Sequence, residues 1–247
     1  VKTLKEAGFK KLIVTAKHHD GFCIWASEAT QYDVSGATNY QGGKGDVLAD
    51  ISKACTEHDM DMGLYLSPWD IHDESYGYKD ASGKALVEFV DTNNDGKPDQ
   101  LIEILGNDKY GNKGHFKEVW MDGAKGSGAG YQEYDFKKWF DTIQQYEGIA
   151  GNQVDDCMLF GAEAYTTVRW IGNENGFAAE ETWSKSNVDK EKNTINSNSS
   201  GGYTKGFPDG NQWTVPEADA RITSGWFWGD SKKTPKTMEE LSEMYFR

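Results

Sequence analysis

The sequence predicts an α/β protein whose parallel strands and helices form a (β/α)8-like barrel of the TIM type. Two observations carry this prediction: strand and helix patterns alternate through residues 1–150, and polar residues stand at the ends of the predicted strands. Alternation alone also fits a doubly wound sheet. No glycine-rich phosphate loop follows any of these strands, which argues against a nucleotide-binding sheet.

The first part of the chain contains three predicted strands, which end at "HHD", "SPWD" and "DGA". In order, the predicted elements are a strand over Lys11–Thr15, a helix over Val47–His58, a strand over Met62–Leu66, the end of a helix over Asp99–Gly106, a strand over 116–124 and a helix over 134–147. Parallel strands bring such polar ends to one edge, where barrel enzymes carry their functional residues.

The later part of the chain has a different composition. Residues 184–210 are rich in Ser, Asn and Gly, and we interpret them as a long loop. Residues 212–230 are aromatic and β-like, and residues 236–247 form a predicted helix. Because the chain begins in a helix that leads directly into the first strand, we expect it to be a piece of a longer protein.

Composition excludes several kinds of partner. The 247 residues carry a formal net charge of −14, which argues against nucleic acid, because phosphate binding depends on clustered Lys and Arg. No run approaches the ~18 apolar residues that a membrane span needs. The nine tryptophans suit both a core and a surface that stacks on sugar rings. Cys23, Cys55 and Cys157 are too few and too scattered for a disulfide framework, so we expect buried or free thiols.

Two carboxylates are candidates for catalysis. Asp122 follows the apolar run in "VWMDGA", where a strand could hold it as a nucleophile, or where it could simply cap the next turn. Glu174 lies in "VRWIGNENGFA", close to Trp170, and apolar contact can raise the pKa of such a group toward that of a general acid. The alternative is a solvated loop glutamate. Two carboxylates on loops of one barrel face would form a glycosidase pair.

His18 and His19 follow the first strand and have several interpretations. A zinc site needs three or four ligands, and no spacing such as HExxH supplies them. A Ser–His–Asp triad lacks its G-x-S-x-G elbow. Two imidazoles at a strand end can instead donate hydrogen bonds to a polyhydroxylated ligand and accept them from it. A structural role remains open as well.

The segment "DTNNDGKPD" resembles the start of a calcium loop, with oxygen ligands at Asp91, Asn93, Asp95 and Asp99. The twelfth position of such a loop is Ile102 rather than Glu, and Glu103 comes one residue late. It is therefore not a complete EF-hand loop, although shorter Asp-rich loops also take calcium. A solvated acidic turn is the alternative.

Six motifs in this order resemble the α-L-fucosidases of glycoside hydrolase family 29: "TAKHHDGFCIW", "GKGDVLADI", "MGLYLSPWD", "EVWMDGA", "RWIGNENG" and "GWFW". The resemblance runs through nearly all of the chain. The "GNE" segment resembles the branch of the family that acts on α-1,3 and α-1,4 fucosyl linkages of Lewis-type glycans.

The resemblance implies roles for individual residues. Asp122 matches the nucleophile of the family, Glu174 matches its acid/base, and His18 and His19 match the paired histidines that grip the hydroxyls of fucose. It further implies contacts with fucose or the glycan beyond it for Trp25, Tyr65, Trp69, Asp70, His72, Arg169, Trp170 and Trp226. The implied reaction is retaining hydrolysis of a fucosylated oligosaccharide or glycoconjugate, without a catalytic cofactor and with calcium as a possible structural ion.

The chain departs from the family pattern at both ends. From the family pattern, we expect the usual first strand, with its own fucose-binding histidine, to lie before residue 1, and the C-terminal β-sandwich to lie outside these residues. We therefore expect one partial catalytic domain over residues 1–247, with 91–99 as a calcium-loop-like insertion. The substrate implies an extracellular or cell-surface location. A lectin-like glycan binder without catalysis and, more distantly, a metal-dependent hydrolase are the competing functions.

Overall fold

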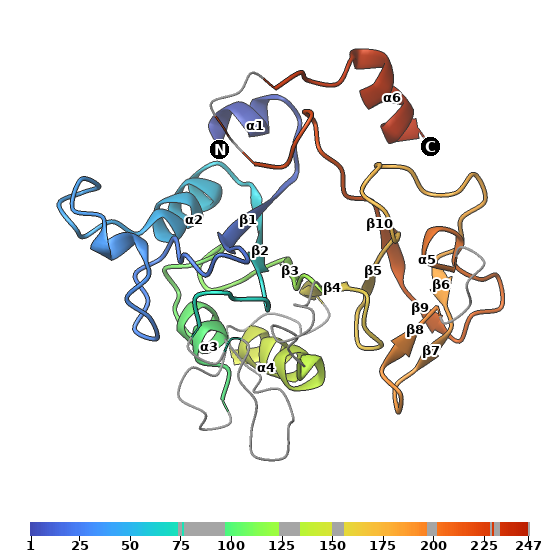
Figure 1. Cartoon of the computed structure of the whole chain (residues 1–247), viewed down its shortest axis with the longest axis horizontal. Helices are drawn as coiled ribbons and strands as arrows, with labels where there is room; N and C mark the ends of the chain where they lie inside the picture. The colour runs from blue at the N-terminus through green and yellow to red at the C-terminus, as the bar shows by residue number, and fades with distance from the viewer. Residues whose placement is uncertain are drawn as a thin grey trace. The chain divides into compact units, whose positions relative to one another are not determined.

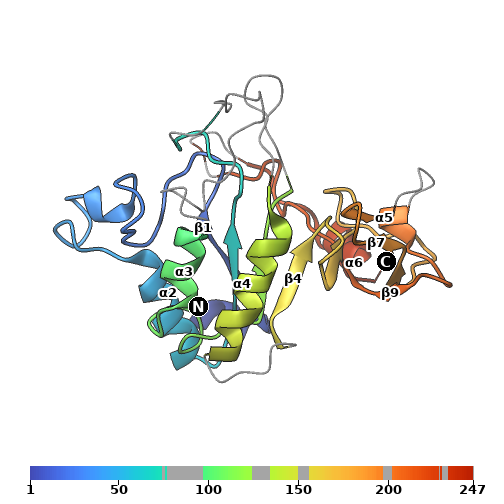
Figure 2. The same ribbon diagram turned by 90° about the horizontal axis from the view of Figure 1, so that it is seen from below.

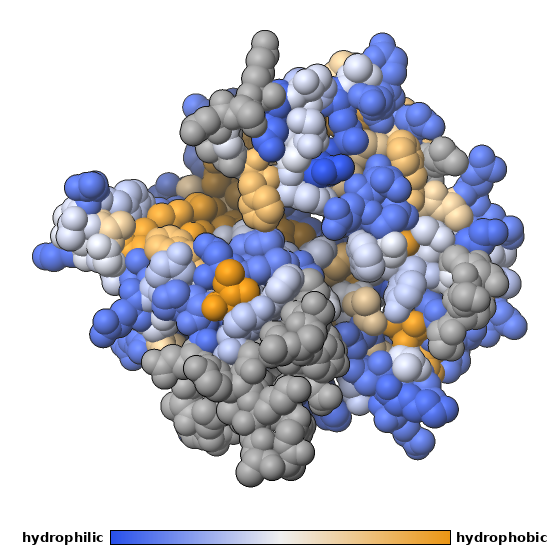
Figure 3. Space-filling model, in the orientation of Figure 1, coloured by the Kyte–Doolittle hydropathy of each residue, from blue (hydrophilic) through white to orange (hydrophobic). Residues whose placement is uncertain are grey.

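A computed structural model of the chain describes residues 1–73, 76, 97–123, 134–149, 156–196, 202–227, 229 and 233–246. The chain divides into two compact units, Val1–Leu159 and Phe160–Arg247. Figure 1 shows the elements of both, coloured along the chain. Figure 3 shows one face of the molecule, on which hydrophilic residues predominate and hydrophobic residues appear in separate areas.

The first unit is built on parallel strands. Its elements are α1 (Lys2–Glu6), β1 (Lys11–Lys17), a 3-10 helix (Val34–Gly36), α2 (Val47–Glu57), β2 (Asp61–Leu66), α3 (Asp99–Leu105), β3 (Glu118–Trp120) and α4 (Phe136–Ile149). β2 pairs in parallel with β1 on one side and with β3 on the other. β4 (Met158–Gly161) begins in this unit, where the Met158 N–H donates to Lys117 O at 2.9 Å. The predicted α/β class with a parallel sheet is confirmed in this unit.

Burial explains why this sheet is parallel and helix-covered. In β2, Met62, Leu64 and Leu66 are fully buried, and so is Gly63 between them, so both faces of the strand are covered. A Cβ atom at Gly63 would lie 2.9 Å from Ile13 Cγ1, which explains glycine at this close approach. α2 packs against β1 and β2, and α3 packs against α4 (Figures 1 and 2).

Helix α2 begins where its sequence predicts. The Asp46 carboxylate accepts a hydrogen bond from the Ala49 N–H at 2.9 Å, as an N-cap residue does. The helix then buries Leu48, Ser52 and Cys55, whose spacing places them on one face. This face anchors α2 to the sheet.

The second unit mixes parallel and antiparallel pairing. Its further elements are β5 (Val168–Trp170), β6 (Lys185–Ser186), β7 (Val188–Asp189), β8 (Thr194–Ile195), α5 (Gly202–Lys205), β9 (Gln212–Trp213), β10 (Val215–Glu217) and α6 (Met238–Phe246). β5 pairs in parallel with the end of β4 and with β10. Two small antiparallel sheets join β6 to β9 and β7 to β8.

The interpretation of residues 184–210 as a long loop is wrong. They contain β6, β7, β8 and α5, and the Asn211 side chain reinforces β7 by donating to Val188 O at 2.8 Å and accepting from the Val188 N–H at 2.9 Å. Strands of two residues are too short for a hydrophobic period, so composition alone suggested a loop.

Other boundaries also differ from the predictions. The strand predicted over 116–124 is only Glu118–Trp120, so Asp122 lies two residues beyond its end. β1 runs two residues further than predicted, to Lys17. Closure of the strands into a barrel and the single-domain organisation both stay predictions. All three cysteines are buried free thiols, as expected, and burial raises the pKa of each. Among the described helices, none combines the length and apolar character that crossing a bilayer requires.

Candidate active site

The carboxyl ends of β1, β2 and β3 bring together the residues with polar chemistry in the first unit. His18 and His19 follow β1 directly, Ser67 and Trp69 follow β2, and Asp122 follows β3. Because the three strands are parallel neighbours, these ends meet at one edge of the sheet. Sequence reasoning predicted that the strand ends "HHD", "SPWD" and "DGA" converge, but it assigned no role to Ser67.

Asp122 is held by hydrogen bonding within this cluster. The Tyr65 hydroxyl donates to Asp122 Oδ2 at 2.7 Å. His19 Nε2 lies 3.7 Å from the same oxygen, which is too long for a hydrogen bond but close enough for electrostatic interaction. The Asp122 side chain is 24% exposed and thus accessible to a ligand. A carboxylate that is oriented yet accessible can serve as a nucleophile or as a hydrogen-bond acceptor.

Aromatic rings surround this carboxylate. His18 stacks on Tyr65 with their planes 2° apart and centroids 5.6 Å apart, and Tyr65 in turn stacks on Trp120 at 5.1 Å. The His19 ring is tilted against Trp69 at 4.8 Å. Trp120 was missed in the sequence, although it stands two residues before Asp122, on the same face of an extended segment.

Both histidines are held toward the neutral state. Burial is the main cause that lowers the pKa of His18, and it opposes the attraction of Asp122. Burial also lowers the pKa of His19, with further lowering by His18 and Lys17, while Asp122 and Asp20 act in the opposite direction. Neutral imidazoles can both donate and accept hydrogen bonds, which suits a ligand with several hydroxyl groups.

Lys17, which directly precedes the two histidines in the sequence, forms a buried ion pair with Asp70. Lys17 Nζ lies 2.9 Å from Asp70 Oδ2, and both side chains are at most 5% exposed. The other Asp70 oxygen accepts the His72 and Asp73 N–H groups at 2.9 and 3.0 Å. The expectation that Asp70 faces a glycan is therefore wrong: its oxygens are directed inward to Lys17 and the backbone.

The glycine of the "HHDG" segment allows this pair to form. Gly21 has a φ of +82°, and a Cβ atom there would lie 2.2 Å from Asp70 Oδ1. Only a residue without a side chain fits this approach. The His72 ring is not part of this ion pair. It stacks on Tyr32, with ring centroids 4.0 Å apart.

Trp25 is buried rather than exposed. Its side chain is fully buried, and the indole N–H donates to Glu103 Oε2 at 3.0 Å. The same Glu103 oxygen accepts from the Ser27 hydroxyl at 2.8 Å. A role for Trp25 in direct contact with a ligand stays a prediction, while its packing role is evident.

The second unit contains the other predicted carboxylate. Glu174 is exposed after β5, and Glu174 Oε2 accepts a hydrogen bond from the Trp226 indole N–H at 2.9 Å. The structure thus brings together Glu174 and Trp226, which are 52 residues apart in the sequence. An indole donor can orient a carboxylate for proton transfer.

The two residues at the end of β5 have different environments. The Trp170 indole N–H donates to Asp219 Oδ1 at 2.7 Å. Arg169 is fully buried, donates to Trp183 O at 3.2 Å, and has its pKa lowered by burial. The Arg169 side chain therefore lies inside the second unit, and its predicted contact with substrate is untested.

The predicted calcium ligands lie mostly outside the described residues. Asp91, Asn93 and Asp95 are not described, and Asp99 is the first residue of α3. Within the described ranges, no group of three or more His, Cys, Asp or Glu side chains is arranged to hold a metal ion. Calcium binding by residues 91–99 stays a prediction.

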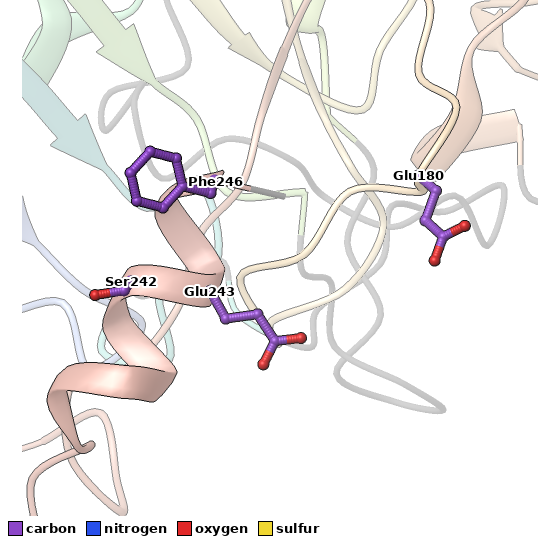
Figure 4. A pocket seen from close by; sticks show the side chains of 4 residues that line it. All are labelled: Glu180, Ser242, Glu243 and Phe246. Atoms are coloured by element: carbon purple, nitrogen blue, oxygen red, sulfur yellow. The ribbon is translucent and has the colours of Figure 1, made fainter.

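A pocket of about 490 Å³ lies elsewhere in the second unit (Figure 4). Ser242, Glu243 and Phe246 of α6 line it together with Glu180 from the segment before β6. It contains two carboxylates and none of the predicted site residues, so the pocket is distinct from the residues described above.

An oriented carboxylate among histidines and stacked aromatic rings, at the carboxyl edge of a parallel sheet, is typical of a glycoside hydrolase. The family model of α-L-fucosidase matches residues 1–244. The chain belongs to the α-L-fucosidase family.

Individual relatives agree with this assignment. The chain is 38% identical over 246 residues to Alpha-L-fucosidase 1 of Arabidopsis thaliana, covering 100% of this chain and 43% of that protein. It is 70% identical, with a TM-score of 0.86, to a Ruminococcus gnavus GH29 fucosidase solved in complex with fucose, covering 99% of this chain and 49% of that one. It is also 43% identical to SpGH29, whose crystal structure matches with a TM-score of 0.81. This match covers 98% of this chain and 49% of SpGH29. The chain thus spans less than half the length of each of these relatives.

Proposed function

We propose that this protein is a retaining exo-α-L-fucosidase that releases terminal fucose from oligosaccharides or glycoconjugates. Family membership supports this activity, and the fucose complex of the Ruminococcus gnavus relative supports fucose as the sugar that the site accepts. The observation that carries the proposal is the environment of the Asp122 carboxylate. It accepts a hydrogen bond from the Tyr65 hydroxyl at 2.7 Å and lies 3.7 Å from His19 Nε2.

In the proposed mechanism, an Asp122 oxygen attacks the anomeric carbon of fucose and forms a covalent ester. Glu174, as the acid, transfers its proton to the glycosidic oxygen while the bond from that oxygen to the anomeric carbon breaks. Glu174 is then a carboxylate and takes a proton from water, whose oxygen attacks the anomeric carbon and displaces Asp122. Two inversions give fucose of the original anomeric configuration.

Replacement of Asp122 tests the proposal. In Asp122→Ala, fucose release falls by several orders of magnitude, while fucose still stabilises the protein against thermal unfolding. The matched control is Asp141→Ala, which removes an exposed carboxylate of α4 that pairs with Lys137. Near-normal release by Asp122→Ala would overturn the assignment. Fucose binding without release by the unmodified protein would favour the glycan-binding alternative.

We further propose that the α-1,3 and α-1,4 linkages of Lewis-type glycans are preferred. The support is the "GNE" segment around Glu174 in the sequence. Parallel assays of a Lewis-type trisaccharide and 2′-fucosyllactose test this preference. Release from the first alone supports it, and equal release from both leaves the activity but removes the preference.

Two further proposals rest on the sequence alone. A structural calcium ion in residues 91–99 predicts that a chelator lowers the melting temperature and that added calcium restores it. An unchanged melting temperature would argue against the ion. An extracellular or cell-surface location follows from the substrate class, and fractionation of producing cells tests it.

A further inference from the structure

Ser67 contacts His19 directly but is neither the proposed nucleophile nor the proposed acid. Its side-chain oxygen lies 2.5 Å from His19 Nδ1 and 2.9 Å from the carbonyl oxygen of Trp69. Ser67 is fully buried, which keeps water from replacing either partner. These two contacts determine where the hydrogen atoms lie.

A serine hydroxyl has one hydrogen to donate, and a backbone carbonyl can only accept. The contact with Trp69 O therefore uses the Ser67 hydrogen. The short contact with His19 must then be donated by Nδ1–H, because a bare Nδ1 and the Ser67 oxygen would otherwise face each other without a hydrogen. In the neutral ring, Nε2 is consequently left with a lone pair.

The backbone fixes both partners of this hydrogen bond. The Ser67 N–H donates to Lys17 O at 3.0 Å, and the Ile71 N–H donates to His19 O at 3.0 Å. The segments after β1 and β2 are thus joined on both sides of the contact. The backbones of Ser67 and His19 therefore cannot separate without breaking this extension of the β1–β2 pairing.

The neutral state of His19 follows from its surroundings. Burial is the main cause that lowers its pKa, and electrostatic interaction with His18 and Lys17 lowers it further. Asp122 and Asp20 oppose this shift without reversing it. The ring is therefore neutral near pH 7, since even an unperturbed histidine is mostly neutral there.

His19 Nε2 faces an acceptor rather than a donor. It lies 3.7 Å from Asp122 Oδ2, and that oxygen already accepts the Tyr65 hydroxyl. A bare nitrogen and a carboxylate oxygen share no hydrogen, so Nε2 is left as an acceptor for a hydrogen that a bound molecule can donate. The His19 side chain is 23% exposed, which leaves it accessible.

We infer that Ser67 is a positioning residue that fixes His19 as the Nδ1–H tautomer, so that Nε2 accepts a hydrogen bond from a hydroxyl group of the substrate sugar. This assigns a direction to the contact: the sugar donates and the protein accepts. The inference deepens the proposed function and rests on it for the identity of the sugar.

Nuclear magnetic resonance of the ¹⁵N-labelled protein tests the tautomer without requiring activity. Two-bond ¹H–¹⁵N correlations of His19 distinguish a protonated Nδ1 from a protonated Nε2. The expected result at pH 7 is a single Nδ1–H form in the unmodified protein and a mixture of tautomers in Ser67→Ala. Nε2–H in the unmodified protein, or an unchanged tautomer in Ser67→Ala, would overturn the inference.

Kinetics with deoxygenated substrates test the acceptor role. Aryl α-L-fucosides lacking the 2-, 3- or 4-hydroxyl are compared on the unmodified protein and on Ser67→Ala. Removal of one of the three hydroxyls should lower kcat/KM about tenfold less in Ser67→Ala than in the unmodified protein, as expected for loss of one hydrogen bond. Ser67→Thr, which keeps the hydroxyl, should restore the pattern. The control Ser52→Ala removes another buried hydroxyl, one that donates to Leu48 O at 2.7 Å, and should leave the pattern unchanged.

Equal sensitivity of both proteins to all three deoxygenated substrates would overturn the acceptor role. If the unmodified protein released no fucose at all, the proposed function would fail, while the His19 tautomer would still be decided by the resonance measurement. The two failures are therefore distinguishable.

Discussion

The hydroxyl of Tyr65 lies 2.7 Å from Oδ2 of Asp122 and donates its hydrogen to that carboxylate. Tyr65 belongs to β2, and Asp122 follows the neighbouring parallel strand β3, so the contact joins residues 57 positions apart in the sequence. A hydrogen bond to a carboxylate favours one orientation of the group. In the proposed mechanism, this orientation directs Asp122 toward the anomeric carbon.

Tyr65→Phe should lower kcat/KM for an aryl α-L-fucoside by about 10- to 100-fold, because a hydrogen bond to a charged group contributes about 1.5–3 kcal/mol. The measurement is steady-state kinetics on a variant whose circular dichroism is unchanged. Tyr110→Phe is the matched control. It removes a hydroxyl that donates to Asp46 Oδ2 at 2.9 Å, and it should lower stability without lowering activity. Equal losses of activity in both variants would contradict the role of Tyr65.

Trp226→Phe should lower fucose release by about 3- to 10-fold, because the exposed carboxylate of Glu174 loses the indole donor at 2.9 Å. Phenylalanine retains an aromatic ring, although a smaller one, so much of the apolar contact is preserved. Trp213→Phe is the control, since Trp213 is 67% exposed and carries none of the proposed roles. An activity loss of the same size in Trp213→Phe would show that the effect is not specific to Glu174.

Asp70→Ala should destabilise the protein by about 3–5 kcal/mol, because it leaves the buried ammonium group of Lys17 without its partner. Urea unfolding measures this change. The double variant Lys17→Met, Asp70→Leu should recover part of the loss, since it removes both buried charges. Glu57→Gln serves as the comparison: it breaks an exposed pair with Lys53 and should change stability by less than about 0.5 kcal/mol. A small effect of Asp70→Ala would contradict the burial of the pair.

Glu147 should make stability depend on pH. It is buried, it contacts His115 Nδ1, and it accepts the Phe116 N–H at 3.0 Å. Burial raises the pKa of Glu147, and the hydrogen bonds and the charges of His115 and Lys117 only partly oppose this. Above the ordinary glutamate value of about 4.3, the unfolded chain has lost the proton that the folded protein keeps. The free energy of unfolding therefore falls as the pH rises through this window.

Glu147→Gln removes this titration but keeps an oxygen for the Phe116 N–H. Urea unfolding between about pH 4 and pH 7 should give a flatter pH dependence for Glu147→Gln than for the unmodified protein. The exposed Glu57→Gln should follow the unmodified protein. Parallel curves for Glu147→Gln and the unmodified protein would show that Glu147 has no shifted titration.

Much of the first unit could be predicted from its sequence. Buried parallel strands leave a continuous apolar signal, as over Met62–Leu66, and their ends are marked by "HHD" and "SPWD". The grouping of His18, His19, Tyr65, Trp69 and Asp122 follows from the parallel arrangement. Trp120 could have been added from its spacing to Asp122 alone.

The remaining features depend on contacts between distant segments. The inward direction of Asp70 is fixed by Lys17, 53 residues earlier, and by the absence of a side chain at Gly21. The strands of residues 184–210 are two residues long, and β6 pairs with a segment far along the chain, Lys185 with Trp213. No local pattern contains this information. The burial of Trp25 likewise depends on Glu103, 78 residues away.

Trapping of the covalent intermediate tests the central claim most directly. A 2-deoxy-2-fluoro fucosyl fluoride reacts with a retaining fucosidase and leaves a slowly hydrolysed ester on the nucleophile. Digestion and mass spectrometry should locate one fluorofucosyl group on the peptide that contains Asp122, and Asp122→Ala should not be labelled. A label on another carboxylate, or turnover that yields the inverted sugar without any label, would contradict the assignment of Asp122 as nucleophile.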